Sequence, residues 1–202
     1  MKKLIVALLV ATLCMVAPVA AFDWDALPTN AEVLIDPVQP FAYAYFDISI
    51  GANSYSGWCV DTVNFAQQGI PYSADLSTTV GVDEQWNKVN WVLNNKGEAT
   101  STEIQAAIWT LRGQVIPDYN SHWYTARAQQ LVADADPSYV PTWYPDIGAV
   151  LIIPSGNTFS QSTIIEVPMP PCPPPVPEFP TMMIPVFLVG SLLVASNVLK
   201  KE

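Results

Sequence analysis

The chain has 202 residues and a formal net charge of −10, with 18 acidic and only 8 basic residues. Such an acidic chain is a poor partner for nucleic acid or for an anionic lipid surface, because both carry the same sign of charge. With one histidine and three cysteines the sequence has too few ligands for a zinc site, and it contains no glycine-rich phosphate loop. We therefore expect no cofactor and no nucleic-acid partner.

The first 21 residues predict a signal peptide. Two lysines precede an apolar run over residues 4–19, and small residues follow, ending at Ala21. This order of charged, apolar and small segments is typical of exported proteins, with cleavage expected after Ala21. An uncleaved anchor helix is the alternative, although the run is short for a membrane span of about 20 residues. Cys14 would leave with the signal peptide.

Residues 22–167 predict one extracellular domain, long enough to bury a sizeable core. We expect an α+β fold: a β-rich sandwich or barrel-like domain with an inserted helical subdomain. Apolar or alternating runs predict strands over residues 32–38, 41–51, 57–63, 148–155 and 161–169. The last two strands would pair as a hairpin. Residues 51–57 predict a turn and residues 64–79 a loop.

Helical periodicity and capping signals predict helices over residues 83–95, 100–113 and 121–136. The second is the clearest, because Thr100 and Glu103 have the spacing of a capping box and Gly113 lies just past its end. The residues expected in the core are Trp91, Leu93, Ile108, Trp109, Leu111, Leu131, Leu151, Ile153 and Ile165.

After export, Cys59 and Cys172 are the cysteines that remain. Exported cysteines tend to oxidise, so a disulfide between them is one interpretation. Cys172, however, lies in a proline-rich segment that is not expected to pack on the domain. A buried free thiol that acts as a small apolar side chain is a second interpretation of Cys59.

A third interpretation joins Cys59 to Gln105. The segments "GWCVD" (57–61), "VNWVLNN" (89–95) and "EIQAAIW" (103–109) together resemble the thioester domains of surface adhesins. The resemblance implies an internal thioester between the Cys59 sulfur and the Gln105 side chain. A primary amine on a partner would attack this bond, so the protein would be an adhesin that binds covalently.

One position departs from the family pattern. The residue before the glutamine is Thr in the family and Ile104 here. The resemblance therefore leaves open a second function: a structural or non-covalent protein of the cell envelope on the same scaffold, without a formed thioester.

The chemistry of the bond needs rigid elements on both sides, because a carboxamide reacts with a thiol only in close contact and away from water. A strand that carries Cys59 and a capped helix that carries Gln105 would supply them. The helix N-terminus would also stabilise negative charge on the Gln105 carbonyl oxygen. Trp58 and Trp109 are candidates for excluding water, with core packing as the alternative for Trp109, and Asp61 is a candidate supporting residue.

Other chemistry has weaker support, and we expect no enzyme. A Cys/His hydrolase would need Cys59, the single His122 and Asp61 to meet in space. Asp134 and Asp136 could bind calcium, but they also fit an ordinary helix end, which we favour.

The C-terminal region predicts a spacer and an anchor. Residues 168–180 include eight prolines and predict a stiff, extended segment of about 40 Å. Residues 181–199 carry no charge and would span roughly 28 Å as a helix, close to a bilayer core, and the basic end at residues 200–202 predicts a cytoplasmic terminus.

The four residues before the apolar segment add a resemblance. "PEFP" (Pro177, Glu178, Phe179 and Pro180), followed by an apolar span and a basic end, resembles the PEF-CTERM sorting signal of archaeal surface proteins. The resemblance implies that an archaeosortase removes the membrane helix and leaves the domain attached to the cell surface. A permanent single-pass membrane anchor is the alternative, and both place the domain outside the cell.

Overall fold

The computed structural model describes residues 22–36, 45–156 and 160–174. Six strands form a closed barrel in the order β1-β2-β3-β6-β5-β4, and every neighbouring pair is antiparallel. Their bounds are β1 (Ala31–Ile35), β2 (Phe46–Ile50), β3 (Asn53–Cys59), β4 (Tyr72–Thr78), β5 (Ile147–Pro154) and β6 (Thr163–Pro168). The pairing of β1 with β4 closes the barrel.

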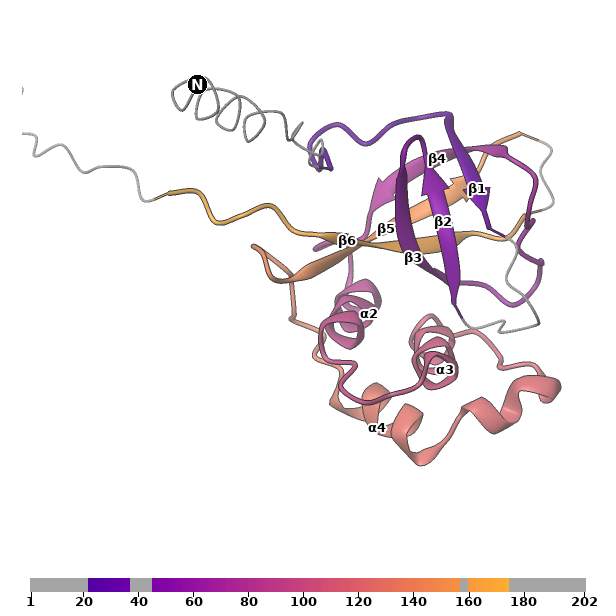
Figure 1. The fold of residues 1–202 in the computed structure, drawn as a ribbon. Coiled ribbons are helices and arrows are strands. Elements are labelled where there is room, and N and C mark those ends of the chain that lie inside the picture. The colour runs from indigo at the N-terminus through magenta and orange to yellow at the C-terminus, as the bar shows by residue number, and fades with distance from the viewer. Residues whose placement is uncertain (1–21, 37–44, 157–159, 175–202) are drawn as a thin grey trace, which may run out of the picture. The chain divides into compact units, whose positions relative to one another are not determined.

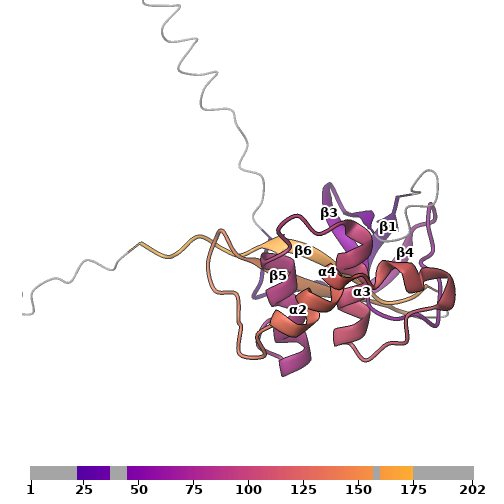
Figure 2. The same ribbon diagram turned by 90° about the horizontal axis from the view of Figure 1, so that it is seen from below.

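The helices lie between β4 and β5 in the chain and cover one side of the barrel (Figure 1). They are α2 (Glu84–Asn94), α3 (Ser101–Leu111), the 3-10 helix η1 (Asp118–Trp123) and α4 (Ala126–Asp134). Seen from below, the helices lie together in front of the strands (Figure 2). The expected β-rich domain with inserted helices is therefore present, and its β part is a barrel.

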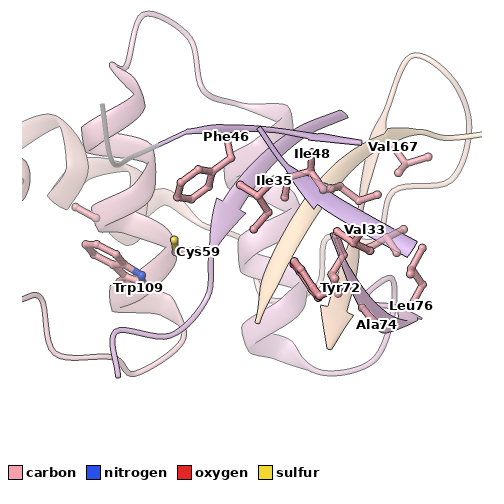
Figure 3. Close-up of a cluster of buried hydrophobic side chains, with 14 of the residues drawn as sticks. Val33, Ile35, Phe46, Ile48, Cys59, Tyr72, Ala74, Leu76, Trp109 and Val167 are labelled. Atoms are coloured by element: carbon pink, nitrogen blue, oxygen red, sulfur yellow. The ribbon is translucent and has the colours of Figure 1, made fainter. Parts of the chain in front are cut away.

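The buried side chains fall into two clusters because alternate residues of a strand point to opposite faces. The first fills the barrel interior and includes Val33, Ile48, Cys59, Ile152 and Ile165, with further members shown in Figure 3. The second lies between the outer barrel wall and the helices. The first cluster needs a glycine in β3, since a Cβ at Gly57 would lie only 2.3 Å from Ile48 Cδ1.

Helix α2 is attached to the barrel by two asparagines. Asn90 Oδ1 accepts a hydrogen bond from the Ala149 backbone N–H at 2.8 Å, and Asn90 Nδ2 donates to Thr79 Oγ1 at 3.1 Å. Asn94 pairs with both backbone groups of Ile147, at 2.7 Å each. The helix therefore satisfies backbone groups of β5 through side-chain amides, as buried polar groups require.

The first two predicted helix starts agree with the structure. Asp83 caps α2, and Thr100 and Glu103 form the expected capping box at α3. The expected hairpin of the last two strands is present as β5 and β6.

Three expectations about elements and three about core residues were wrong. Strand β4 occupies the second half of the predicted loop 64–79, and β3 begins inside the predicted turn 51–57. The predicted helix 121–136 is divided into the end of η1 and α4. Ile153 is exposed, because it is on the outer barrel face where no helix covers it, while Trp91 and Leu151 are only partly buried.

The predicted signal peptide, the PEFP motif at residues 177–180 and the apolar segment 181–199 lie outside the described residues. Within the described part, no helix combines the length and the apolar character needed to cross a membrane. A second unit of the chain begins at Cys172, of which Cys172, Pro173 and Pro174 are described, all exposed and without regular structure.

Candidate functional site

Cys59 is the last residue of β3 and is buried in the barrel-interior cluster. Its neighbour Trp58 points to the opposite face and packs against the helices. Because successive side chains of a strand point to opposite faces, Cys59 faces the barrel interior and Trp58 faces the helices. Phe46 and Trp109 lie near the Cys59 sulfur (Figure 3).

The structure brings Gln105 to Cys59. Helix α3 packs on β3 and places the fully buried Gln105 side chain against the end of the strand. The Cys59 backbone N–H donates to Gln105 Oε1 at 2.9 Å, and Gln105 Nε2 donates to the Cys59 carbonyl at 2.8 Å. This two-bond pairing fixes the position and the plane of the carboxamide beside Cys59.

A cavity of about 460 Å³ adjoins Cys59. Its volume is within the range of small-molecule sites, roughly 300–1,000 Å³. Its lining combines buried and exposed side chains from β2, β3, α3, η1 and the segments between them: Phe46, Cys59, Asp61, Thr62, Asn64, Phe65, Ala66, Gln68, Trp109, Pro117, Tyr119, Asn120 and Gln161. The thiol is thus buried yet next to a space that a partner group can enter.

Asp61 organises the segment that follows Cys59. One carboxylate oxygen accepts from the backbone N–H groups of Val63 and Asn64, at 3.1 and 3.2 Å. The other accepts from the Ser162 backbone N–H at 3.1 Å, which ties this segment to the start of β6. Asp61 therefore supports the cavity wall, and it contributes a negative charge to the lining.

Gln161 is a second carboxamide at the sulfur. Its amide group lies 2.7 Å from Cys59 Sγ. The orientation of an amide is assigned from its hydrogen-bond partners. With Nε2 toward the backbone carbonyls of Asp61 and Asn64, at 2.7 and 3.1 Å, Oε1 accepts from the Ala66 N–H, so we adopt that orientation. The oxygen of Gln161 then faces the Cys59 thiol.

Burial raises the pKa of the Cys59 thiol well above its ordinary value, and the negative charge of Asp61 raises it further. An N–H of Gln161 directed at the sulfur would lower this pKa, but the adopted orientation presents an oxygen instead. At neutral pH the sulfur is therefore a protonated thiol, and any reaction at this site must also move its proton.

The remaining candidates are placed as follows. Trp109 lines the cavity, stacks on Trp123 with ring centroids 5.8 Å apart and belongs to the core, so the expected core packing is present and its exclusion of water stays a prediction. Trp58 does not line the cavity; its Nε1 donates to Glu166 at 2.7 Å. His122 is exposed beside Trp123 and does not line the cavity with Cys59.

The other sequence-based alternatives concern pairs of residues. Cys59 is buried and Cys172 is exposed, and each is a free thiol in the structure. A disulfide between them stays a prediction, because Cys172 belongs to the second unit of the chain. Asp136 Oδ1 accepts from the Ser138 N–H and hydroxyl, which is the ordinary helix-end arrangement that we favoured over calcium. Among the described residues, no three acidic, His or Cys side chains group as metal ligands.

Two parts of the site were missed from the sequence. Gln161 follows the loop between β5 and β6, far from Cys59 in the chain, and no spacing rule relates the two. Phe65 lies in the predicted loop 64–79, and Tyr119 lies between two predicted helices, in a segment to which we assigned no element. Exposed aromatic residues in such segments are a weak signal that could have indicated a binding surface.

One solved structure is similar in fold. The N-terminal domain of the Streptococcus pyogenes pilus tip adhesin Cpa matches with a TM-score of 0.50 and 9% sequence identity, over 75% of this chain and 100% of that domain. No family model and no curated protein matches the chain. At this identity the likeness is one of fold: the chain has an architecture like that of an adhesin domain.

Proposed function

We propose that this protein is a cell-surface adhesin that binds a partner covalently through a thioester between Cys59 and Gln105. The observation that carries the proposal is the pairing of the Gln105 carboxamide with both backbone groups of Cys59. The likeness to a pilus tip adhesin domain supports the adhesin role, and the resemblance of the sequence segments supports the chemistry.

The site itself supplies all the atoms needed to form the thioester. The Cys59 sulfur attacks Gln105 Cδ, the C–N bond breaks, and the thiol proton leaves with the amide nitrogen as ammonia. The raised pKa of Cys59 is then no obstacle, because the proton is transferred to the leaving group and not to water.

The pairing also fits the charge that develops during the attack. The Cys59 backbone N–H already donates to Gln105 Oε1, the oxygen that becomes negative in the tetrahedral intermediate. A fixed donor at that atom stabilises the transition state more than the ground state. The Cys59 carbonyl accepts from Gln105 Nε2, so it orients the leaving nitrogen.

In the reaction with a partner, the amine is the nucleophile and the Cys59 sulfur is the leaving group. A primary amine that enters the cavity attacks Gln105 Cδ, the C–S bond breaks, and the amine proton passes to the sulfur. The products are a substituted amide at Gln105 and a free Cys59 thiol. Because both side chains are almost completely buried, water reaches the bond less easily than an amine bound in the cavity.

A structural or non-covalent envelope protein is the second candidate. The observation in its favour is that Asn94 makes the same two-bond pairing with the backbone of Ile147 in β5, where there is no thiol. Ile104, which replaces the family threonine, is buried in the helix-side cluster and offers no hydroxyl near Cys59.

The intact mass of the purified protein tests the proposal. A thioester lowers the mass by about 17 Da, one ammonia, and methylamine adds about 31 Da to that form while releasing one thiol. Cys59→Ala and Gln105→Leu should each show the full mass and no reaction with methylamine. A full mass and a free Cys59 thiol in the unmodified protein would overturn the covalent proposal and leave the non-covalent one.

We also propose that the domain is displayed outside the cell, held by the C-terminal segment and processed by an archaeosortase-type enzyme. The sequence patterns at both ends support this location. Surface protease accessibility, compared between the full chain and a chain ending at Val176, should show surface retention of the first and release of the second. Equal retention of both would contradict the role of the C-terminal segment.

A further inference from the structure

The most exposed large apolar side chains of the described residues gather at the cavity. Val63 and Phe65 are each 82% exposed, Val115 is 81% and Tyr119 is 68% exposed. Phe65 and Tyr119 line the cavity beside Cys59, and Val63 and Val115 belong to the same two segments, 62–65 after β3 and 115–119, which runs into η1. We call these four residues the rim.

Exposed apolar residues that occur singly need no explanation, whereas a group around a cavity marks an interaction site. Here the exposure is combined with a concave space whose inner wall is aromatic, formed by Phe46 and Trp109. The rim therefore has the anatomy of a binding site in which apolar contacts surround a reactive group.

The charges around the cavity favour a positively charged partner. Asp61 lines the cavity, and Asp118 is exposed next to Tyr119. No lysine or arginine of the described residues is among the lining residues. An anionic surface would meet these carboxylates and the net negative charge of the chain, whereas a cationic amine would be attracted.

We propose that the rim docks a protein segment in which a lysine is flanked by apolar or aromatic residues. The apolar neighbours pack on Phe65, Tyr119 and the two valines, and the lysine side chain passes between them toward Gln105. This inference rests on the proposed function for the covalent step, but the docking itself does not require the thioester.

The covalent arm of the test compares amines. The probes are methylamine and two capped nonapeptides with a central lysine, one with phenylalanine and leucine as its neighbours and one with serines. We expect the apolar peptide to add to the purified protein about tenfold faster than the serine peptide, because its neighbours bury apolar surface against the rim. Tyr119→Ser and Phe65→Ser should reduce this preference to near unity, with each peptide rate expressed relative to the methylamine rate of the same variant.

Tyr144→Ser is the matched control, because Tyr144 is 67% exposed, almost as much as Tyr119, and does not line the cavity. It should keep the full preference. Equal rates for the two peptides in the unmodified protein, or a preference that survives in both rim variants, would overturn the proposal.

The non-covalent arm separates docking from the thioester. In Cys59→Ala, fluorescence anisotropy of the labelled peptides should still show tighter binding of the apolar peptide, and Tyr119→Ser should remove the difference. If no thioester forms but this difference is present, the docking inference stands and the covalent function fails. Equal binding of both peptides would overturn the docking inference whatever the state of the thioester.

Two other occupants of the rim are distinguished by the same variants. Concentration-dependent dimerisation that disappears in Tyr119→Ser would assign the rim to a second copy of the chain. Binding to neutral lipid vesicles that disappears in the same variant would assign it to a membrane surface. Either result, in place of the peptide preference, would overturn the proposal.

Discussion

Two junctions between the helices and the barrel each use a side-chain carboxamide. At one, Asn90 Oδ1 of α2 accepts from the Ala149 backbone N–H of β5; at the other, the Gln105 carboxamide of α3 pairs with both backbone groups of Cys59 in β3. Both side chains are fully buried. A carboxamide with one acceptor and two donors is well suited to an unpaired stretch of strand backbone.

The surroundings of the two junctions differ. Asn90 lies among apolar side chains and Thr79, with no nucleophile beside it. Gln105 lies beside a thiol and close to a cavity of about 460 Å³. The comparison teaches that the pairing by itself is a structural device, and that the adjacent thiol and the open space are what make chemistry available at the second junction.

The largest expected effect comes from removing each carboxamide. Asn90→Leu and Gln105→Leu leave buried backbone groups without partners, so each should lower the free energy of unfolding by about 2–4 kcal/mol. Denaturant unfolding of both variants measures this. Because the junctions differ in chemistry, Asn90→Leu should keep the thioester mass deficit of about 17 Da, whereas Gln105→Leu should lose it.

A loss of the mass deficit in a folded Asn90→Leu would contradict the separation of the two roles. Circular dichroism and a cooperative unfolding transition establish that the variant is folded. If Gln105→Leu were as stable as the unmodified protein, the junction would not depend on the pairing at all.

The second effect is a pH dependence of the free energy of unfolding. We expect its thiol contribution only in the form with a free Cys59 thiol. Burial raises the pKa of Cys59 in the folded state, so the unfolded chain releases a proton that the folded chain keeps. Stability is therefore complete below about pH 8.5, the ordinary thiol pKa, and falls by up to about 1.4 kcal/mol per pH unit above it. Denaturant unfolding between pH 7 and about pH 9, where an ordinary tyrosine with its pKa of about 10 is still mostly protonated, measures the slope.

Cys59→Ser is the control for this slope, because serine does not titrate in that range. The unfolding free energy of this variant should fall less steeply with pH. The same is expected of the form with a thioester, which has no thiol proton. An equal slope in the free-thiol protein and in Cys59→Ser would mean that the burial of the thiol does not control its ionisation.

The smallest effect is expected at the third carboxamide. Gln161 pairs with the backbone of the 61–66 segment, as the other two carboxamides pair with strands, but it lines the cavity, where water can replace it. Gln161→Leu should therefore cost only about 1 kcal/mol of unfolding free energy. A loss of 3 kcal/mol or more would show that this segment is as closed as the two helix junctions.

Gln161→Leu should also slow thioester formation, since the sulfur loses the group that lies 2.7 Å from it. The mass deficit measured against time after refolding gives this rate. An unchanged rate would mean that Gln105 and the backbone alone position the sulfur.

From the sequence alone, local signals identified α2 and α3 with their ends, whereas the third predicted helix proved to be the end of η1 followed by α4. Asp83 and the Thr100–Glu103 box are caps that a few neighbouring residues create, so they are readable without a fold. The pairing of Cys59 with Gln105 was accessible through resemblance to a family, and the structure brings these two residues together.

Only the tertiary structure decided the rest. The polar residues of β4 made it resemble a loop, although Tyr72, Ala74 and Leu76 alternate with them, and pairing with β1 and β5 makes it a strand. Ile153 is exposed because the helix-side cluster covers the outer face of β5 at Ala149 and Leu151 and does not extend to Ile153. Gln161, Phe65 and Tyr119 meet at Cys59 because barrel closure and helix packing bring together segments that are distant in the chain, and contacts of that kind leave no periodic signal in a single sequence.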